Sequence, residues 1–473
     1  MNTHKRLLST VILPLALLGK LNAAEPSPLA HPARPNVILI LADDLGYGDI
    51  GVHGCKEIPT PNIDRLATQG LRFTNAHCNG TICAPTRAAL MTGLYQNRMG
   101  VEDLRKPLPV KFPTIPERLK ACGYATAMVG KWHLGSSPGF TPPDRGFDEF
   151  FGFHGGVHSY IPPKDEDGDR KSPIIRGQNP VVEKRYLTDA FGEEATAFIS
   201  RQRSAEKPFF LYLAFNAVHV PLQAVEKYSA RFPDIRNPNR KTYAAMLSAM
   251  DDAIGKVLGE LEAIGQADNT VVIFTNDNGG ATTRGAPNSS CNAPLRGSKA
   301  ETFEGGIRVP LLMRWPGVIK PDSVYAQAVC SFDLSATVLA AAGANSSGLD
   351  GVDLLPFLSG QKSGAPHETL FWRCRTLSNN YAALQGDWKY VHSTEGAEHP
   401  GPRQKPAKDM LFDLAEDIGE QHDLAAQYPE KLTELKKKYD LWSESVDADC
   451  RRAGLEPRFD DMTPKWLQER GGH

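Results

Sequence analysis

Four apolar runs in the chain predict strands that are buried on both faces. They span residues 36–42, 209–215, 270–275 and 309–315. Continuous apolar runs of this length are typical of strands in a parallel sheet that helices cover on both sides. Segments with a helical pattern lie between the runs, at residues 62–69, 116–122, 189–200 and 242–264. The alternation predicts an α/β fold, with a large mixed, mostly parallel sheet sandwiched by helices.

The pattern changes near residue 365, where short strand-like runs replace the long ones. They span residues 369–372, 381–384 and 388–391, with turn residues between them. The segment 429–442 then repeats large apolar residues at helical spacing, and most of its lysines fall on the opposite face. We therefore expect an N-terminal domain at residues 35–364 and a smaller C-terminal α+β subdomain, of antiparallel sheet plus helix, at residues 365–473.

The first 24 residues predict a signal peptide. Lys5 and Arg6 precede an apolar run at residues 7–19, and small residues follow at positions 23 and 24. A run of 13 residues is shorter than the 20 or so that a membrane span needs. We expect an exported protein, periplasmic or secreted, without a stable membrane anchor. A retained anchor is the alternative.

Composition narrows the range of partners and scaffolds. The chain carries 53 Lys and Arg against 55 Asp and Glu, a formal net charge of −2, so no basic field favours a nucleic-acid partner. Its eight cysteines are scattered, and none forms a Cys-x-x-Cys pair, which argues against a disulfide scaffold or a zinc ribbon. The pattern assigns no disulfide pairing and no oligomeric state.

Polar residues follow two of the buried strands directly. Asp43 and Asp44 come after the first strand, and Asp277 and Asn278 come after the run at 270–275. Ligands of α/β sheets collect beyond the carboxyl ends of the strands, and buried carboxylates need a positive partner. Oxygen donors of this kind suit a hard divalent cation, so the sequence predicts a Ca²⁺ or Mg²⁺ site. A turn with one helix-capping Asp is the alternative for the first pair.

A Cys-x-Pro-x-Arg element lies between these strand ends. Residues 81–87 read Thr-Ile-Cys-Ala-Pro-Thr-Arg, and a helix-like Ala-Ala-Leu-Met-Thr-Gly follows. This element resembles the signature of the formylglycine-dependent type I sulfatases, a family of the alkaline phosphatase-like superfamily. Other elements match the family in order, over about residues 35 to 445: Gly-Lys-Trp-His-Leu-Gly at 130–135, His219 before Val-Pro, Lys299 after Leu-Arg-Gly-Ser, and Glu-Gly-Gly-Ile-Arg-Val-Pro at 304–310.

The resemblance implies a fold, an activity and a set of site residues. The fold is alkaline phosphatase-like, and the activity is hydrolysis of a sulfate ester. A formylglycine-generating enzyme oxidises Cys83 to 3-oxoalanine (formylglycine), whose hydrate attacks sulfur. The metal, Ca²⁺ with Mg²⁺ as the alternative, takes Asp43, Asp44, Cys83, Asp277 and Asn278 as ligands. The remaining catalytic residues are Arg87, Lys131, His133, His219 and Lys299.

The resemblance also assigns roles within the reaction. Lys131, Lys299 and Arg87 supply positive charge to the sulfate, because its oxygens otherwise repel a nucleophile. His219 or Lys299 is the candidate proton donor to the leaving alcohol. His133 is the candidate base that removes the proton of the second hydroxyl, so that sulfate leaves and the aldehyde returns.

The expected substrate is a sulfated saccharide. The stretch 152–160 is rich in glycine and carries His154 and His158, which suits a saccharide-facing loop, and Arg105 is a weaker candidate of the same kind. A local turn packed by aromatic residues is the alternative. Two other functions remain open: a phosphonate monoester or phosphodiester hydrolase of the same superfamily, and a catalytically silent protein that binds sulfated glycans.

Overall fold

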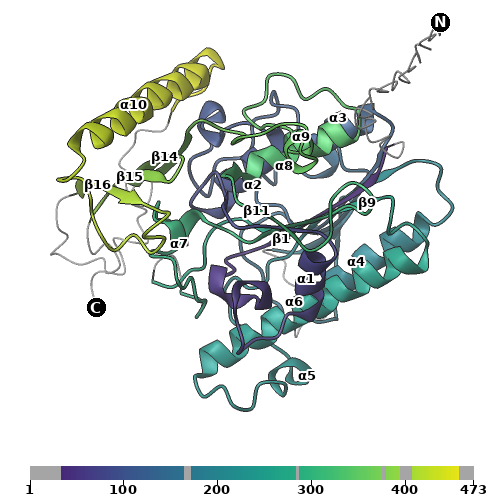
Figure 1. Cartoon of the computed structure of the whole chain (residues 1–473). Coiled ribbons are helices and arrows are strands. Elements are labelled where there is room, and N and C mark those ends of the chain that lie inside the picture. The colour runs from purple at the N-terminus through teal and green to yellow at the C-terminus, as the bar shows by residue number, and fades with distance from the viewer. Residues whose placement is uncertain (1–33, 164–171, 284–286, 375–379, 395–406, 458–473) are drawn as a thin grey trace, which may run out of the picture. The chain divides into compact units, whose positions relative to one another are not determined.

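The computed structural model describes residues 34–163, 172–283, 287–374, 380–394 and 407–457 (Figure 1). The predicted signal peptide, residues 1–24, lies outside these ranges. No helix in the described ranges combines the length and the apolar character that crossing a membrane requires.

Within the described residues, ten strands form one large sheet. Their order is β11 (Ser323–Tyr325), β2 (Leu71–Phe73), β10 (Leu311–Arg314), β9 (Thr270–Asn276), β1 (Asn36–Ala42), β8 (Phe209–Ala214), β4 (Ala125–Lys131), β5 (Glu149–Phe153), β6 (Ile174–Arg176) and β7 (Asn179–Val181). The central strands from β9 to β5 run parallel, while β10 is antiparallel to both of its neighbours. The mixed, mostly parallel sheet confirms the predicted fold class.

Helices cover both faces of this sheet (Figure 1). On one face lie α1 (Pro61–Thr68), α4 (Leu187–Arg201) and α6 (Pro238–Ala263), and on the other lie α2 (Cys83–Thr92), α3 (Ile115–Ala121) and α8 (Ser331–Ala341). The side chains of β1 alternate between two hydrophobic cores, with Ile38 and Ile40 in one and Val37 and Leu39 in the other. This explains why the strand is apolar from Val37 to Ala42.

Element boundaries depart from the sequence prediction where local chemistry decides them. Strand β10 begins at Leu311 rather than at residue 309, because Pro310 lacks the N–H that a strand in the middle of a sheet must donate. Helix α6 begins at Pro238 rather than at residue 242, because the Asn237 side chain accepts hydrogen bonds from the backbone N–H groups of Asn239 and Arg240.

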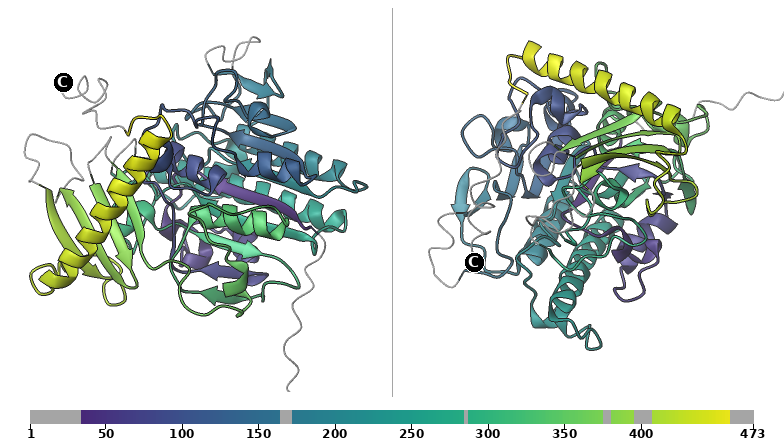
Figure 2. Two further views of the ribbon diagram at one scale, coloured as in Figure 1. Left: turned by 90° about the horizontal axis from the view of Figure 1, so that it is seen from above. Right: turned by 90° about the vertical axis from the view of Figure 1, so that its left-hand side faces the viewer.

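A second, antiparallel sheet follows the large one, as predicted, and it has a fourth strand, β16 (Ala407–Asp413), beyond the three predicted runs. The other three strands are β13 (Leu370–Cys374), β14 (Asn380–Gln385) and β15 (Trp388–Thr394). Helix α10 (Pro429–Arg452) packs across it with buried Leu435, Tyr439 and Trp442 (Figure 2). The helix extends beyond its predicted end at residue 442, because Val446 and Cys450 continue the buried stripe.

The remaining elements are short. They are β3 (Ala76–His77), which pairs with β12 (Val329–Cys330), the helices α5 (Glu226–Ser229), α7 (Glu304–Ile307) and α9 (Leu355–Leu358), and the 3₁₀ turns η1 (Tyr47–Asp49), η2 (Gly51–His53), η3 (Gln96–Met99) and η4 (Pro143–Arg145).

Candidate active site

The acidic residues that follow β1 and β9 lie side by side at one edge of the large sheet. The two strands are parallel neighbours, and Ala42 is in register with Asn276, so the loops that leave them start at the same level. Asn278 Nδ2 donates a hydrogen bond of 2.7 Å to Asp44 Oδ1. The side chains of Asp43, Asp44, Asp277 and Asn278 are all fully buried. Carboxylates that are buried this close together are stable only when cations neutralise their charge.

Arg87 and Lys131 supply two of these cations. Arg87 lies one turn into α2, and its Nε and Nη2 donate to Asp277 Oδ2 at 3.0 and 2.8 Å. Its Nη1 donates to the carbonyl of Lys131 at 2.9 Å, which ties α2 to the end of β4. Lys131 Nζ lies 2.5 Å from Asp43 Oδ2. Burial by itself would raise the pKa of Asp43, but the charge of Lys131 lowers it below the ordinary value, so the carboxylate stays ionised.

Lys299 supplies the third cation, from the loop that precedes α7. Its Nζ lies 2.7 Å from Asp44 Oδ1. Burial opposes ionisation of Asp44, yet the charge of Lys299 brings the pKa of this carboxyl below its usual range. The loop is anchored from two sides, since Ala300 N donates to the Thr81 carbonyl at 2.8 Å and Arg296 Nη1 donates to the Glu420 carbonyl at 2.8 Å.

Cys83 is the first residue of α2 and is only 2% exposed. Burial raises the pKa of its thiol above the ordinary value, although the charges of Lys131 and Lys299 oppose the shift. The unmodified thiol is therefore neutral at pH 7. A neutral thiol is a weak nucleophile, so the plain side chain is not activated for attack.

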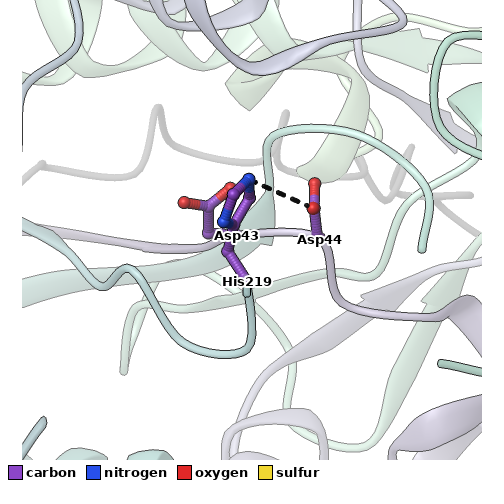
Figure 3. Close-up of side chains that lie close together, drawn as sticks. All are labelled: Asp43, Asp44 and His219. Carbon is purple, nitrogen blue, oxygen red and sulfur yellow. Dashed lines mark ion pairs between the residues drawn. The ribbon is translucent and has the colours of Figure 1, made fainter. Parts of the chain in front are cut away.

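His219 follows β8 and faces Asp44 (Figure 3). Its Nε2 lies 3.6 Å from Asp44 Oδ2. Its Nδ1 lies 2.7 Å from the carbonyl of Val220, and because a carbonyl only accepts, Nδ1 carries a proton. Burial lowers the pKa of His219 below its ordinary value. The neutral ring therefore presents the lone pair of Nε2 toward the carboxylate, an arrangement that a shared cation or proton would relieve.

His133 follows β4 in a left-handed backbone conformation, with a φ of 61°. Its N–H donates to the carbonyl of His154 at 3.0 Å. Its ring packs on Gly156, where an added Cβ would lie 2.6 Å from both Cε1 and Nε2. Burial, reinforced by the charge of Lys131, holds the pKa of His133 well below the ordinary range. The ring is therefore neutral and can accept a proton.

The donor atoms of the acidic loops fit a divalent cation. Asp43 Oδ1 and Asn278 Oδ1 are buried and have no hydrogen-bond partner. Atoms of Asp43, Asp44 and His219 that can bind a metal lie within 4.8 Å of one another. Two unpartnered buried acceptors beside a group of carboxylates are what a hard cation would satisfy. The sequence predicted the four oxygen donors, whereas the proximity of His219 to them comes from the structure.

Two of the predicted substrate residues lie at a common cleft. Arg105 and His154 line a cavity of about 370 Å³ together with His133. The third, His158, lines a different and much smaller pocket of about 20 Å³. Its Nδ1 lies 2.7 Å from the carbonyl of Ser159, and its ring lies 5.0 Å from that of Phe153. The structure thus separates His158 from the other two.

Sequence reasoning missed Asn288, Gly156 and Tyr160 as supports of the site. Asn288 Nδ2 donates to the carbonyls of Asp44 and Val218, each at 3.0 Å, and so joins the loops after β1 and β8. Tyr160 donates its hydroxyl to the carbonyl of His219 at 2.8 Å. The glycine-rich stretch was a signal for Gly156, but nothing in the local sequence distinguishes Asn288 from other loop asparagines.

Two family models match the chain. One, described as "Sulfatase", matches residues 35–344. The other, described as "N-sulphoglucosamine sulphohydrolase, C-terminal", matches residues 298–443. Together they span both sheets, including the loops that carry every catalytic candidate.

Similar proteins agree with this assignment. N-acetylgalactosamine-6-sulfatase of Sus scrofa is 32% identical over 470 residues, covering 89% of this chain and 87% of that protein. Arylsulfatase A of Homo sapiens is 35% identical over 472 residues, covering 89% of each. The solved structure of Ps i-CgsB in complex with k-i-k-neocarrahexaose matches with a TM-score of 0.81 and 33% identity, covering 92% of this chain and 97% of that one. The chain therefore belongs to the sulfatase family of the alkaline phosphatase-like superfamily.

Proposed function

We propose that this sulfatase removes sulfate from a sulfated carbohydrate, with a nucleophile made from Cys83 and a divalent metal ion beside it. The observation that carries the proposal is the position of Cys83, whose electrostatic neighbours are Lys131, Lys299 and the carboxylates of the acidic loops. The carbohydrate part is supported by two similar proteins, one described as an N-acetylgalactosamine-6-sulfatase and one solved with k-i-k-neocarrahexaose.

The oxygen donors of Asp43, Asp44, Asp277 and Asn278, with the side chain at position 83, would hold Ca²⁺ or Mg²⁺. When bound, the ion supplies positive charge that attracts the sulfate oxygens and favours an ionised oxygen nucleophile. Arg87 keeps Asp277 in place through the two hydrogen bonds to its Oδ2.

The buried thiol of Cys83 is neutral and a weak nucleophile, so the nucleophile that we propose is a modified form of this side chain. Oxidised to formylglycine and hydrated, the side chain supplies an oxygen nucleophile together with a second hydroxyl, which allows sulfate to leave without water attacking sulfur. A formylglycine-generating enzyme is then a required partner.

The signal-like N-terminus supports export of the protein, to a periplasmic or secreted location.

The basic residues bind the sulfate group and transfer protons during the reaction. Lys131 and Lys299 neutralise the negative charge that a sulfate ester brings to the acidic loops. Lys299 gives a proton to the departing alcohol oxygen from the ammonium group that faces Asp44. His219 is the alternative donor, in a form that has first taken up a proton at Nε2. His133 is neutral and accepts the proton of a hydroxyl at position 83.

The test joins mass spectrometry with substrate assays. The protein is expressed with a formylglycine-generating enzyme, and the mass of the peptide that contains Cys83 is measured. Release of sulfate from a panel of sulfated saccharides is measured in parallel with hydrolysis of an aryl phosphonate and a phosphodiester. We expect conversion of Cys83, sulfate release, and slower hydrolysis of both phosphorus esters.

The Cys83→Ser variant serves as the matched control. We expect it to lose turnover by about three orders of magnitude or more, because a serine ester with sulfate has no second hydroxyl to expel it. Its melting temperature should remain close to that of the wild type. An unmodified cysteine in an active protein, or repeated turnover by Cys83→Ser, would contradict the mechanism. Faster hydrolysis of the phosphorus esters would contradict the substrate class.

A further inference from the structure

A cleft of about 370 Å³ opens beside His133, which is the only catalytic candidate among its described lining residues. Four separate segments line it: residues 104–106, 133–136, 154–156 and 172–175. Its volume lies in the range of small-molecule sites, and it exceeds what the sulfate group alone requires. The cleft therefore has room for the part of a substrate that surrounds the reacting ester.

The described lining residues of this cleft include basic side chains and no Asp or Glu. Arg105 and Lys106 are the basic residues, and His133 and His154 add two imidazole rings. Lys106 Nζ contacts only a carbonyl among the described residues, that of Glu456 at 3.3 Å, so no carboxylate there neutralises it. Clefts lined by one sign of charge concentrate ligands of the opposite sign.

Two polar side chains of the cleft, those of Arg105 and His154, are available to a ligand. Arg105 is exposed, and no described residue forms an ion pair with its guanidinium. Its backbone is fixed, because Asp103 Oδ1 accepts hydrogen bonds from the N–H groups of Arg105 and Lys106 at 2.6 and 3.0 Å. The His154 ring stacks on Phe150 at 5.4 Å, and its buried Nε2 has no partner. An exposed cation on an anchored backbone and an unpartnered imidazole suit an oxyanion.

We propose that this cleft binds a second oxyanion of the substrate, carried by the sugar adjacent to the one that loses sulfate, with Arg105 as its main contact. The proposal rests on the proposed function and narrows its substrate class to saccharides with at least two negative groups. Sulfate and carboxylate share the required chemistry, since each offers oxygens to a guanidinium.

The test measures binding rather than turnover, by calorimetry on the full chain with Cys83→Ser. Three disaccharides are compared: one from κ-carrageenan with a single sulfate, one from ι-carrageenan with two sulfates, and one from chondroitin 6-sulfate with one sulfate and one carboxylate. We expect Arg105→Gln to weaken at least one doubly charged disaccharide about tenfold and the singly charged one much less. Which of the two is weakened identifies the second oxyanion as sulfate or carboxylate.

Two controls make the result specific to the cleft. Lys111→Gln removes an exposed positive charge that does not line the cleft, and it should leave all three affinities within twofold. Higher salt should weaken the doubly charged disaccharides less in Arg105→Gln than in its parent, because an exposed ionic contact is screened. Equal effects on all three disaccharides, or no binding by the parent, would overturn the proposal. Failure of sulfate release with this selectivity intact would instead contradict the proposed function.

Discussion

Lys131 of β4 and Lys389 of β15 are both lysines with fully buried side chains, and both pair with carboxylates. Lys131 contacts Asp43 at the candidate active site. Lys389 Nζ lies 2.7 Å from Glu304 Oε1 and 2.9 Å from Glu420 Oε1, where the small sheet meets α7. We refer to the groups around Lys389, namely His77, Glu304, Arg308, Lys389 and Glu420, as the junction cluster.

The two lysines differ in what surrounds them. In the junction cluster, Glu304 also accepts from His77 Nε2 at 3.0 Å and from Arg308 Nε at 2.5 Å, and its backbone N–H donates to Glu420 at 2.6 Å. Both oxygens of Glu304 are therefore occupied, and the atom of the junction cluster left without any partner is His77 Nδ1. Around Lys131, the atom without a partner is a carboxylate oxygen, Asp43 Oδ1, and the nearby His219 side chain remains 9% exposed. A spare carboxylate oxygen with access to solvent can bind a cation, whereas a carboxylate with both oxygens occupied mainly holds the fold.

The largest effect should come from Lys131→Met. We expect kcat/KM for sulfate release to fall about a thousandfold, because a preorganised positive charge next to the reacting group is lost. Stability should change less than in Lys389→Met, since Arg87 Nη2 still lies 3.6 Å from Asp43 Oδ2. Steady-state kinetics and thermal unfolding measure the two effects. If Lys131→Met kept a tenth of wild-type activity, the lysine of the candidate active site would not differ in function from the lysine of the junction cluster.

The next effect should come from Lys389→Met. We expect the free energy of unfolding to fall by about 3–5 kcal/mol, because Glu304 and Glu420 lose the cation that they share. Activity per folded molecule should fall less than tenfold. Urea unfolding measures the change. Lys438→Ala in α10 is the control, because Lys438 Nζ pairs with Glu368, whose side chain is 80% exposed, and the variant is expected to change stability by only about 0.5 kcal/mol or less. Equal losses in both variants would speak against a special role of the junction cluster.

The smallest effect concerns pH. Burial raises the pKa of Glu420 to about 7, with the charge of Lys389 opposing and that of Glu304 adding to the shift. The folded chain therefore holds a proton that the unfolded chain releases near pH 4.5, so this group's contribution is complete below that pH and is lost as the pH rises through 7.

Glu420→Gln isolates this contribution, because the amide resembles the protonated acid at every pH. We expect the melting temperature of the variant, relative to the wild type, to rise between pH 5 and pH 8, with up to about 3 kcal/mol in favour of the variant at the upper end. A difference that stays constant over this range would show that Glu420 does not titrate there.

Strands that are buried on both faces could be predicted from sequence alone, because most positions in them are apolar. Strand β1 matches its predicted range, and β8 and β9 differ by one residue at one end. Strand β4 was missed, since its sequence, Ala-Thr-Ala-Met-Val-Gly-Lys, mixes small, polar and apolar residues and becomes a strand through its pairing with β5 and β8. Tertiary contacts, rather than local sequence, therefore make this segment a strand.

Some residues of the candidate site could likewise be predicted from sequence, and others could not. Residues that lie next to a motif or a strand end, such as Asp43 and Cys83, could be recognised from their neighbours in sequence. Asn288 could not, because its partners are distant along the chain. Glu304 and Arg308 lie in the Glu-Gly-Gly-Ile-Arg-Val-Pro element, but the contact of Glu304 with His77 forms only after folding. No local pattern marks such a pair.

The hydrogen bond from Arg296 to the Glu420 carbonyl has a consequence for how the chain can be recombined. The carbonyl of Arg296 also accepts a hydrogen bond of 2.6 Å from the N–H of Gly305. Through Arg296, the loop that bears Lys299 is therefore attached to Glu420, a residue beyond β16. The small sheet is therefore not an exchangeable module. A chimera that replaced everything after residue 364 would inherit Lys299 from one parent and one of its anchors from the other, and the donor's backbone would have to place a carbonyl where that of Glu420 lies.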